Sequence, residues 1–235
     1  MGRKFKLWKD PYGCGYNLYK KSIIEIKPGV TVLVGCNGIG KTTLLSCIRS
    51  TLKKDNIPYL DFNNLSDGGA YAKQESLNKG DFSFLAAAAC SSEGENIMLN
   101  ITDLATKIGQ FVRTGIYQKD VDALAKMFQK GLGFDNKDSE VPINERWILF
   151  DAVDSGLSVD NIVELKENLF RTILQYPFDN EIYIIISANE YEMSHGEQCL
   201  DVYNGKYITF KTYEDYRNMI LESRKWKDKR CAAKK

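Results

Sequence analysis

The stretch Gly35-Cys36-Asn37-Gly38-Ile39-Gly40-Lys41-Thr42 decides the fold of this chain. It fits the phosphate-binding loop pattern G-x-x-x-x-G-K-[ST] at every defined position. The β-branched, apolar segment 30–34 before it predicts a buried strand, and apolar residues at helical spacing predict a helix over 41–53. In this strand–loop–helix arrangement, backbone N–H groups at the helix N-terminus receive an anion. The sequence therefore predicts an α/β domain with a P-loop NTPase sheet that binds a nucleoside triphosphate.

A run of neighbouring positions is expected to bind the phosphates: Asn37, Gly38, Ile39, Gly40, Lys41, Thr42 and Thr43. Lys41 adds a full positive charge near the β- and γ-phosphates, so it is also a candidate catalytic residue. The Thr42 hydroxyl is placed to hold Mg²⁺.

A second candidate site is the segment Trp147-Ile-Leu-Phe-Asp151, in which a buried strand predicted over 146–150 is followed by an acidic residue. P-loop NTPases use such a strand end to hold Mg²⁺. Asp154 follows shortly after, at the start of a predicted helix, and ligands bind at the carboxyl ends of strands in such sheets. Asp151 and Asp154 are therefore candidate catalytic residues, and Asp151 is also a candidate metal ligand.

The remaining pattern predicts a single domain over residues 1–235, with flanking helices and a helical lobe at about 77–140. That lobe lies between the phosphate loop and the acidic strand. Other strands are expected at 5–8, 22–26, 57–62, 182–186, 199–203 and 207–210, and other helices over 158–176 and 213–227.

Composition narrows the function classes. A hydrophobic content of 43% and a charged content of 27% are typical of a soluble globular domain, and the net charge of +1 carries no information about nucleic acid. No apolar run reaches the length of a membrane span, and the N-terminus lacks a secretion signal. Scattered cysteines indicate reduced thiols in the cytoplasm, and a single histidine argues against zinc.

A third element, Ser91-Ser92-Glu93-Gly94-Glu95, stands at the start of a predicted helix. With the phosphate loop and the Asp154–Ser158 segment, it makes the chain resemble an ABC-type ATPase over roughly residues 22–210. The family signature Leu-Ser-Gly-Gly-Gln/Glu is matched at Ser92, Gly94 and Glu95. The resemblance implies ATP and Mg²⁺ as cofactors and a head-to-tail homodimer, in which one subunit's signature closes over the γ-phosphate held by the other. An ordinary helix N-cap with acidic first-turn residues is the alternative.

The chain departs from the family pattern at the chemistry. The family's general base is a Glu directly after the acidic-strand Asp, and here that position is Ala152. The family's switch His falls at Ala188 or Asn189. Asp154 or Glu190 are the available substitutes for the base, and Asn189 is a neutral donor for the γ-phosphate. Ordinary loop polarity is the alternative for all three. The resemblance thus implies slow or partner-dependent hydrolysis.

Two further assignments follow from the family resemblance. ABC-type domains often stack adenine on an aromatic before the loop strand, and here Tyr16 or Tyr12 occupies that region, with packing at a sheet edge as the alternative. Gln74, between the loop helix and Ser92, is the candidate for the family's Mg²⁺-contacting Gln.

The long helical region before the acidic strand suits the RecF-like and SMC-like branch better than transporter subunits, and the absence of heptads indicates a head without arms. A basic C-terminal run offers contacts to a DNA backbone or is a solvated helix end. Its residues are Arg224, Lys225, Lys227, Lys229, Arg230, Lys234 and Lys235, with Trp226 and Asp228 between them. We expect an ATPase in a DNA transaction such as repair or recombination. The alternative is a non-hydrolysing switch that assembles with a partner protein, and a transporter energiser is disfavoured.

Overall fold

The structure is a computed structural model that describes residues 2–13, 15, 17–63, 105, 107–115, 144–175 and 180–232. Residues 231 and 232 are described as backbone only. Its centre is a six-stranded sheet with the order β4-β5-β6-β3-β7-β8. All neighbours in it pair in parallel except β7 and β8. The strands are β3 (Gly29–Val34), β4 (Tyr59–Asn63), β5 (Glu145–Asp151), β6 (Glu181–Ser187), β7 (Gln198–Asp201) and β8 (Lys206–Ile208).

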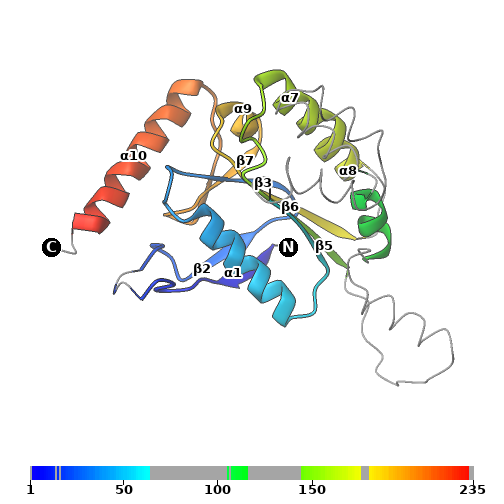
Figure 1. The fold of residues 1–235 in the computed structure, drawn as a ribbon, viewed down its shortest axis with the longest axis horizontal. Coiled ribbons are helices and arrows are strands. Elements are labelled where there is room, and N and C mark those ends of the chain that lie inside the picture. Colours follow the sequence, from blue (N-terminus) through cyan, green and yellow to red (C-terminus); the bar gives the residue numbers. More distant parts are fainter. Residues whose placement is uncertain are drawn as a thin grey trace, which may run out of the picture.

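A second, two-stranded sheet pairs β1 (Arg3–Lys6) with β2 (Ile23–Ile26) in antiparallel register. The described helices are α1 (Lys41–Lys54), α7 (Val159–Glu164), α8 (Arg171–Gln175), α9 (Tyr191–Ser194) and α10 (Tyr213–Ala232). A π-helical turn, Leu165–Phe170, joins α7 to α8. Figure 1 shows α10 running along the side of the molecule that carries the loop between β3 and α1.

Helices cover both faces of the six-stranded sheet, because successive residues of a strand point to opposite faces. Trp147 and Leu149 of β5 pack in one hydrophobic cluster with α1 and the β1–β2 sheet, whereas Ile148 and Phe150 pack in a second cluster with α7 and α8. Burying a large apolar side chain contributes about 1.5–3 kcal/mol relative to leaving it exposed. This mostly parallel, two-sided sheet confirms the predicted α/β class with a P-loop NTPase fold.

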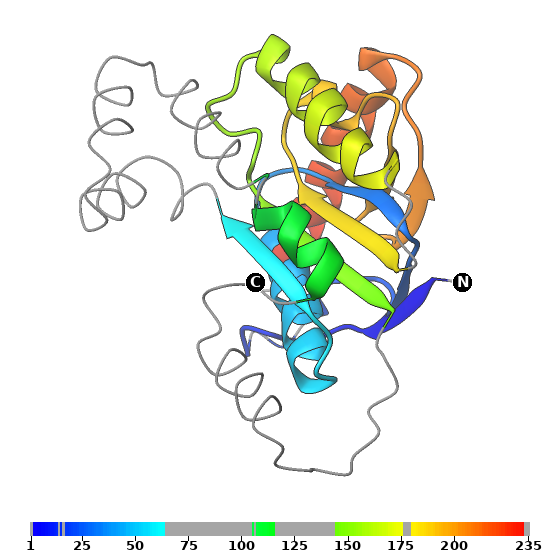
Figure 2. The ribbon, with the colours of Figure 1, turned by 90° about the vertical axis from the view of Figure 1, so that its right-hand side faces the viewer.

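The described part of the predicted helical lobe is a helix over 107–114, drawn in green in Figure 2. Its residues Ile108, Phe111 and Val112 are buried in the same cluster as Ile148 and Phe150 of the sheet. This segment is therefore part of the main hydrophobic core. The other residues of the predicted lobe lie outside the described ranges, so the lobe as a unit stays a prediction.

The sequence-based boundaries differ from the structure at the C-terminal end. The last helix was expected over 213–227 but runs to Ala232, and the short helix α9 was not expected. The extra turns of α10 are held by a tertiary contact, since the Arg230 guanidinium donates to the Leu18 carbonyl at 2.7 Å. Such a contact leaves no periodic signal in the local sequence.

The strand order determines where ligands can bind. β6 lies between the phosphate-loop strand β3 and the acidic strand β5, and all three are parallel. The loops that follow these strands therefore meet at one edge of the sheet, which is the usual ligand-binding edge of such folds.

Candidate functional site

The phosphate loop leads directly into α1, whose N-cap is Gly40 with a φ of 120°. A side chain at this position would lie 2.8 Å from the Leu18 side chain, so the backbone there requires glycine. Within the described residues, no side chain caps this helix end and its first turn holds no acidic residue. The first backbone N–H groups of α1 are thus available to an anion, and the helix dipole favours one.

Lys41 and Thr42 begin α1 and contact the neighbouring strand ends. The buried Lys41 ammonium donates to the Gly35 carbonyl at 2.7 Å, at the other end of the loop. Burial lowers the pKa of the Lys41 ammonium below its ordinary value, and the nearby Cys36, Asp154 and Asp151 side chains oppose that shift. When a nucleotide binds, its phosphate oxygens would replace the neutral Gly35 carbonyl as the hydrogen-bond partner of this ammonium.

The Thr42 hydroxyl donates to Oδ1 of Asp151 at 3.1 Å. This hydrogen bond joins the end of the glycine loop to the end of β5, two segments far apart in the sequence. A hydroxyl and a carboxylate oxygen are the hard ligands that Mg²⁺ prefers, and P-loop NTPases hold the ion through this pair of residue types. The residues present therefore fit a Mg²⁺-bound nucleotide, and two of the three predicted metal ligands lie together.

Ala152 follows Asp151 in a left-handed backbone conformation, with a φ of 54°. Its N–H donates to the Ser187 carbonyl of β6 at 3.2 Å, and its own carbonyl accepts the N–H of Ser155 at 3.1 Å. The backbone of this turn is thus fixed on both sides. Its methyl group cannot take a proton, so this position supplies no general base.

Asp154 lies in the same turn and is only 1% exposed. Its Oδ2 accepts the backbone N–H groups of Asn189 at 2.6 Å and Glu190 at 2.7 Å, which follow β6. Its Oδ1 is buried and has no hydrogen-bond partner among the described residues. Burial raises the pKa of the Asp154 carboxyl above its ordinary value, and the amide hydrogen bonds and the Lys41 charge oppose the shift. Asp154 therefore joins the loops after β5 and β6.

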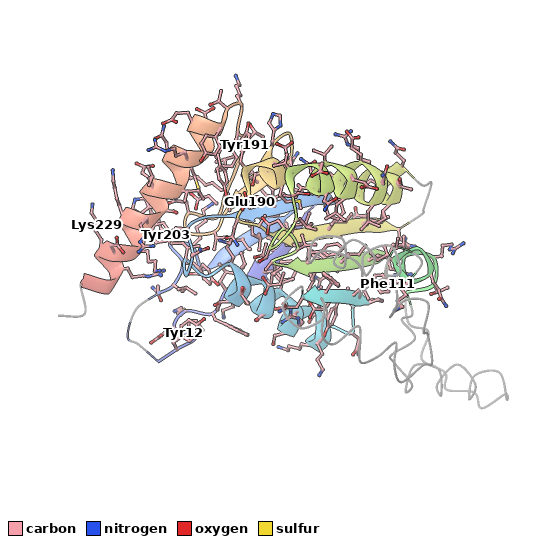
Figure 3. The ribbon with its side chains drawn as sticks, turned by 45° about the horizontal axis from the view of Figure 1, so that its top comes forward. Tyr12, Phe111, Glu190, Tyr191, Tyr203 and Lys229 are labelled. Carbon is pink, nitrogen blue, oxygen red and sulfur yellow. The ribbon has the colours of Figure 1, made fainter. Side chains whose placement is uncertain are left out.

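Of the other predicted polar residues, Asn189 and Glu190 have exposed side chains. Figure 3 labels Glu190 at the start of α9, beside Tyr191. The Asn189 carbonyl also accepts the hydroxyl proton of Tyr216 from α10. Asn189 thus follows β6 at the edge of the sheet where the strand loops meet, and Glu190 is exposed there. Their roles at the nucleotide stay predictions.

Tyr12 lies beside the beginning of α1. Its hydroxyl is 2.6 Å from the Thr43 hydroxyl, and its side chain is 63% exposed. Figure 3 shows it on the N-terminal loop, below α1. Tyr12, one of the two aromatic candidates for the nucleotide base, is therefore next to a predicted phosphate-binding residue. Tyr16, the other candidate, lies outside the described residues.

The structure adds a contact that sequence reasoning missed: α10 packs against the phosphate loop. The buried Ser223 hydroxyl accepts the N–H of Cys36 at 2.8 Å and donates to the Ile220 carbonyl at 2.7 Å. The Lys227 ammonium donates to the Asn37 carbonyl at 2.8 Å. The one available signal is that Ile220, Ser223 and Lys227 recur at helical spacing on one face.

A cavity of about 350 Å³ lies between the phosphate loop and α10. Its walls include Cys36 and Asn37 of the loop, Asn189 after β6, and Arg217 and Arg224 of α10. Each arginine also pairs with an acidic residue on its own helix, Arg217 with Glu214 and Arg224 with Asp228. The cavity lining therefore extends from the phosphate loop to Asn189, which follows β6.

The remaining predicted site residues lie outside the described ranges: Gln74, Ser92, Gly94 and Glu95. The signature segment and the second Mg²⁺ contact therefore stay predictions. Across the described parts of the chain, no group of His, Cys, Asp and Glu side chains forms a separate metal site, and no helix has the length and apolarity to cross a bilayer.

Comparison with known proteins supports the same site. A family model described as an AAA domain matches residues 13–87, which include β2, β3, the phosphate loop, α1 and β4. No curated protein matches the chain. The match places a domain of the AAA-type P-loop ATPase superfamily, a kind found in SMC-like and RecF-like proteins, on the residues that form the phosphate loop. Geometry and comparison together indicate a nucleotide-binding domain of the P-loop ATPase class.

Proposed function

We propose that this chain is a cytoplasmic ABC-type ATPase of the compact, RecF-like or SMC-like branch that binds ATP with Mg²⁺. The observation that carries the proposal is the hydrogen bond between Thr42 and Asp151, beside the buried Lys41 ammonium. The matching AAA model supports the nucleotide class. The buried, free thiols of Cys36, Cys47 and Cys199 suit a reducing compartment.

Each of these residues has a defined part in binding. Lys41 exchanges the Gly35 carbonyl for phosphate oxygens, and the N–H groups at the start of α1 receive the remaining phosphate charge. Thr42 and Asp151 hold the metal, which neutralises charge that develops on the phosphates. Tyr12, whose hydroxyl lies 2.6 Å from the Thr43 hydroxyl, is the residue that stacks against the base.

Hydrolysis by this site is slow in the proposal, because Ala152 replaces the residue that would activate water. A positioned general base contributes typically about 10²–10⁴-fold. Asp154 is the remaining buried carboxylate near Lys41, and its raised pKa suits proton uptake near neutral pH better than an ordinary aspartate would. Two backbone amides already occupy one of its oxygens, so only Oδ1 is available for that role.

Assembly completes the site in this proposal. Two chains pair head to tail around ATP, with Ser92, Gly94 and Glu95 of one chain over the phosphates held by the other. The process served is a DNA transaction such as repair or recombination. The domain kind matched at residues 13–87 supports this branch, and exposed Lys225 and Lys229 on α10 are the DNA contacts.

A second candidate is a non-hydrolysing switch that assembles with a partner protein when ATP binds. The observation that favours it is the turn at Ala152, whose backbone is fixed by Ser187 and Ser155 and whose side chain lacks any proton acceptor. In this case ATP binding alone changes the assembly state.

The deciding experiment measures Mg²⁺-ATP turnover against protein concentration, with and without DNA. The proposal expects a rate that rises more steeply than linearly with protein concentration, and that increases further with DNA. Negligible turnover at every concentration, together with confirmed ATP binding, supports the switch. Absence of ATP binding overturns both functions.

A further inference from the structure

The C-terminal helix α10 is built into the phosphate loop. Figure 1 shows its C-terminal half beside the loop between β3 and α1. Ser223 holds the Cys36 amide at 2.8 Å, and Lys227, one turn further along, holds the Asn37 carbonyl at 2.8 Å. Two consecutive residues of the loop thus have their backbone groups bound by this helix.

The Lys227 ammonium also lies directly over the next loop residue. A Cβ placed on Gly38 would be 2.7 Å from Lys227 Nζ and 3.2 Å from its Cε, so the charged end of the side chain is against the backbone of this turn. Lys227 is only partly exposed. The ammonium is therefore held at the loop, in a contact that remains accessible to solvent.

Packing on both sides of Lys227 keeps the helix in this position. Trp226 stacks on Tyr203 with ring centroids 5.0 Å apart and an interplanar angle of 27°, and Arg230 donates to the Leu18 carbonyl. Figure 3 shows Tyr203 beside the C-terminal half of α10, with Lys229 on its outer side. The basic-tail interpretation assigns Trp226 and Arg230 to DNA. In the structure both residues contact other parts of the same domain, Tyr203 and Leu18.

We propose that Lys227 is a cationic finger supplied in cis, which contacts the terminal phosphate of ATP bound at this loop. The inference rests on the proposed ATP site and adds a residue to it. An ammonium has three N–H donors, and the described contacts use one of them on Asn37. Asn37, which this ammonium contacts, lines the same cavity as Asn189 after β6.

The terminal phosphate is the expected target for a physical reason. Lys41 already lies near the β- and γ-phosphates, and a second cation at the loop adds positive charge at the outermost phosphate. That added charge stabilises the negative charge that develops during phosphate transfer. A site without a general base at Ala152 depends more on such electrostatic stabilisation. Because ADP lacks the terminal phosphate, Lys227 contacts ATP but not ADP. The two nucleotides therefore interact differently with α10.

The test compares ATP and ADP affinities of the full chain in Mg²⁺, using fluorescent analogues of both nucleotides. Lys227→Ala is expected to weaken ATP binding by about tenfold or more while leaving ADP binding within about twofold, since a charge-assisted hydrogen bond to one phosphate is lost. Lys227→Arg keeps the preference for ATP. Lys211→Ala, which removes the same charge from an exposed position just before α10, is the matched control and is expected to behave as the unmodified chain.

Equal weakening of ATP and ADP binding by Lys227→Ala overturns the inference, because it indicates that Lys227 only supports the loop. Identical behaviour of Lys227→Ala and Lys211→Ala overturns it too. In either case ATP binding that depends on Lys41 leaves the proposed function in place. If the unmodified chain and Lys41→Ala bind ATP equally, the proposed function fails and this inference fails with it.

Discussion

The two halves of the candidate site follow the family pattern to different degrees. The phosphate loop with α1 keeps every defined residue of the G-x-x-x-x-G-K-[ST] pattern, with a glycine at the helix N-cap and the Lys41 ammonium on the Gly35 carbonyl. The loops after β5 and β6 instead carry Ala152 and the buried Asp154, which binds backbone amides. In the proposed function, nucleotide binding and hydrolysis therefore depend on different segments, and substitutions can separate the two.

The largest expected effect comes from the binding half. At about 100-fold excess over Kd, ATP should stabilise the unmodified chain by about 2.7 kcal/mol. For a domain of this size the midpoint of thermal unfolding then rises by roughly 5–10 °C. Lys41→Ala should abolish this rise. Lys53→Ala, on the exposed C-terminal end of the same helix, should keep it. An unchanged rise in Lys41→Ala would show that ATP binds elsewhere.

Placing a carboxylate at position 152 tests the half of the site that follows β5. Ala152→Glu should raise Mg²⁺-ATP turnover by about 10²–10⁴-fold, the usual contribution of a general base. The left-handed backbone at this position already carries a Cβ, so the longer side chain adds little backbone strain. Turnover is measured under conditions where the unmodified chain is saturated with ATP. If the rate does not change, the half of the site after β5 is not arranged for hydrolysis, which favours the switch.

A smaller effect is expected at Asp154. Asp154→Asn keeps an oxygen for the two backbone amides but cannot accept a proton, so turnover should fall by about 100-fold while ATP affinity is kept. Asp160→Asn, at an exposed position of α7, is the matched control. Loss of ATP binding in Asp154→Asn alone would indicate that Asp154 mainly holds the loop after β6.

The pH dependence of the same pair sharpens this prediction. Burial raises the pKa of Asp154, so turnover that uses its carboxylate should rise with pH through that raised pKa and then level off. Protonation favours the folded state for a group of this kind. The stability it contributes is therefore fully present below the unfolded-state pKa and is lost as the pH rises through the folded-state value. Asp154→Asn should show neither dependence, as measured by turnover and thermal unfolding across the acidic range.

The smallest expected effect concerns the contact between the phosphate loop and α10. Ser223→Ala leaves the buried Cys36 N–H without its acceptor, which costs about 1–3 kcal/mol of the free energy of unfolding. Thermal unfolding should show a decrease of several degrees in the midpoint. Ser50→Ala, on the exposed side of α1, should change stability by less than about 0.5 kcal/mol. Equal midpoints for the two variants would mean that α10 does not support the loop.

Much of the fold was predictable because its signals are local. A phosphate-binding glycine loop has a strand before it and a helix after it, and the spacing of the apolar residues predicted both. The structure confirms them as β3 and α1. The strands β5 and β6 were predicted within one residue at each end. The helix at 107–114 falls within the helical region predicted at about 77–140, and Ile108 and Phe111 lie on its buried face. Its place in the sheet's own core was not, since periodicity shows which face is buried but not what covers it.

The amino-acid sequence alone determined that this protein has a P-loop α/β fold, that Lys41 and Thr42 lie at the phosphate loop, and that Ala152 stands where a base is expected. Backbone propensity, periodicity and a short motif suffice for these. Only the tertiary structure decided that Thr42 meets Asp151, that Asp154 holds the loop after β6, and that α10 binds the phosphate loop through Ser223 and Lys227. These contacts join residues far apart in the sequence. They form because strand order and side-chain packing bring those residues together, and no local pattern records that.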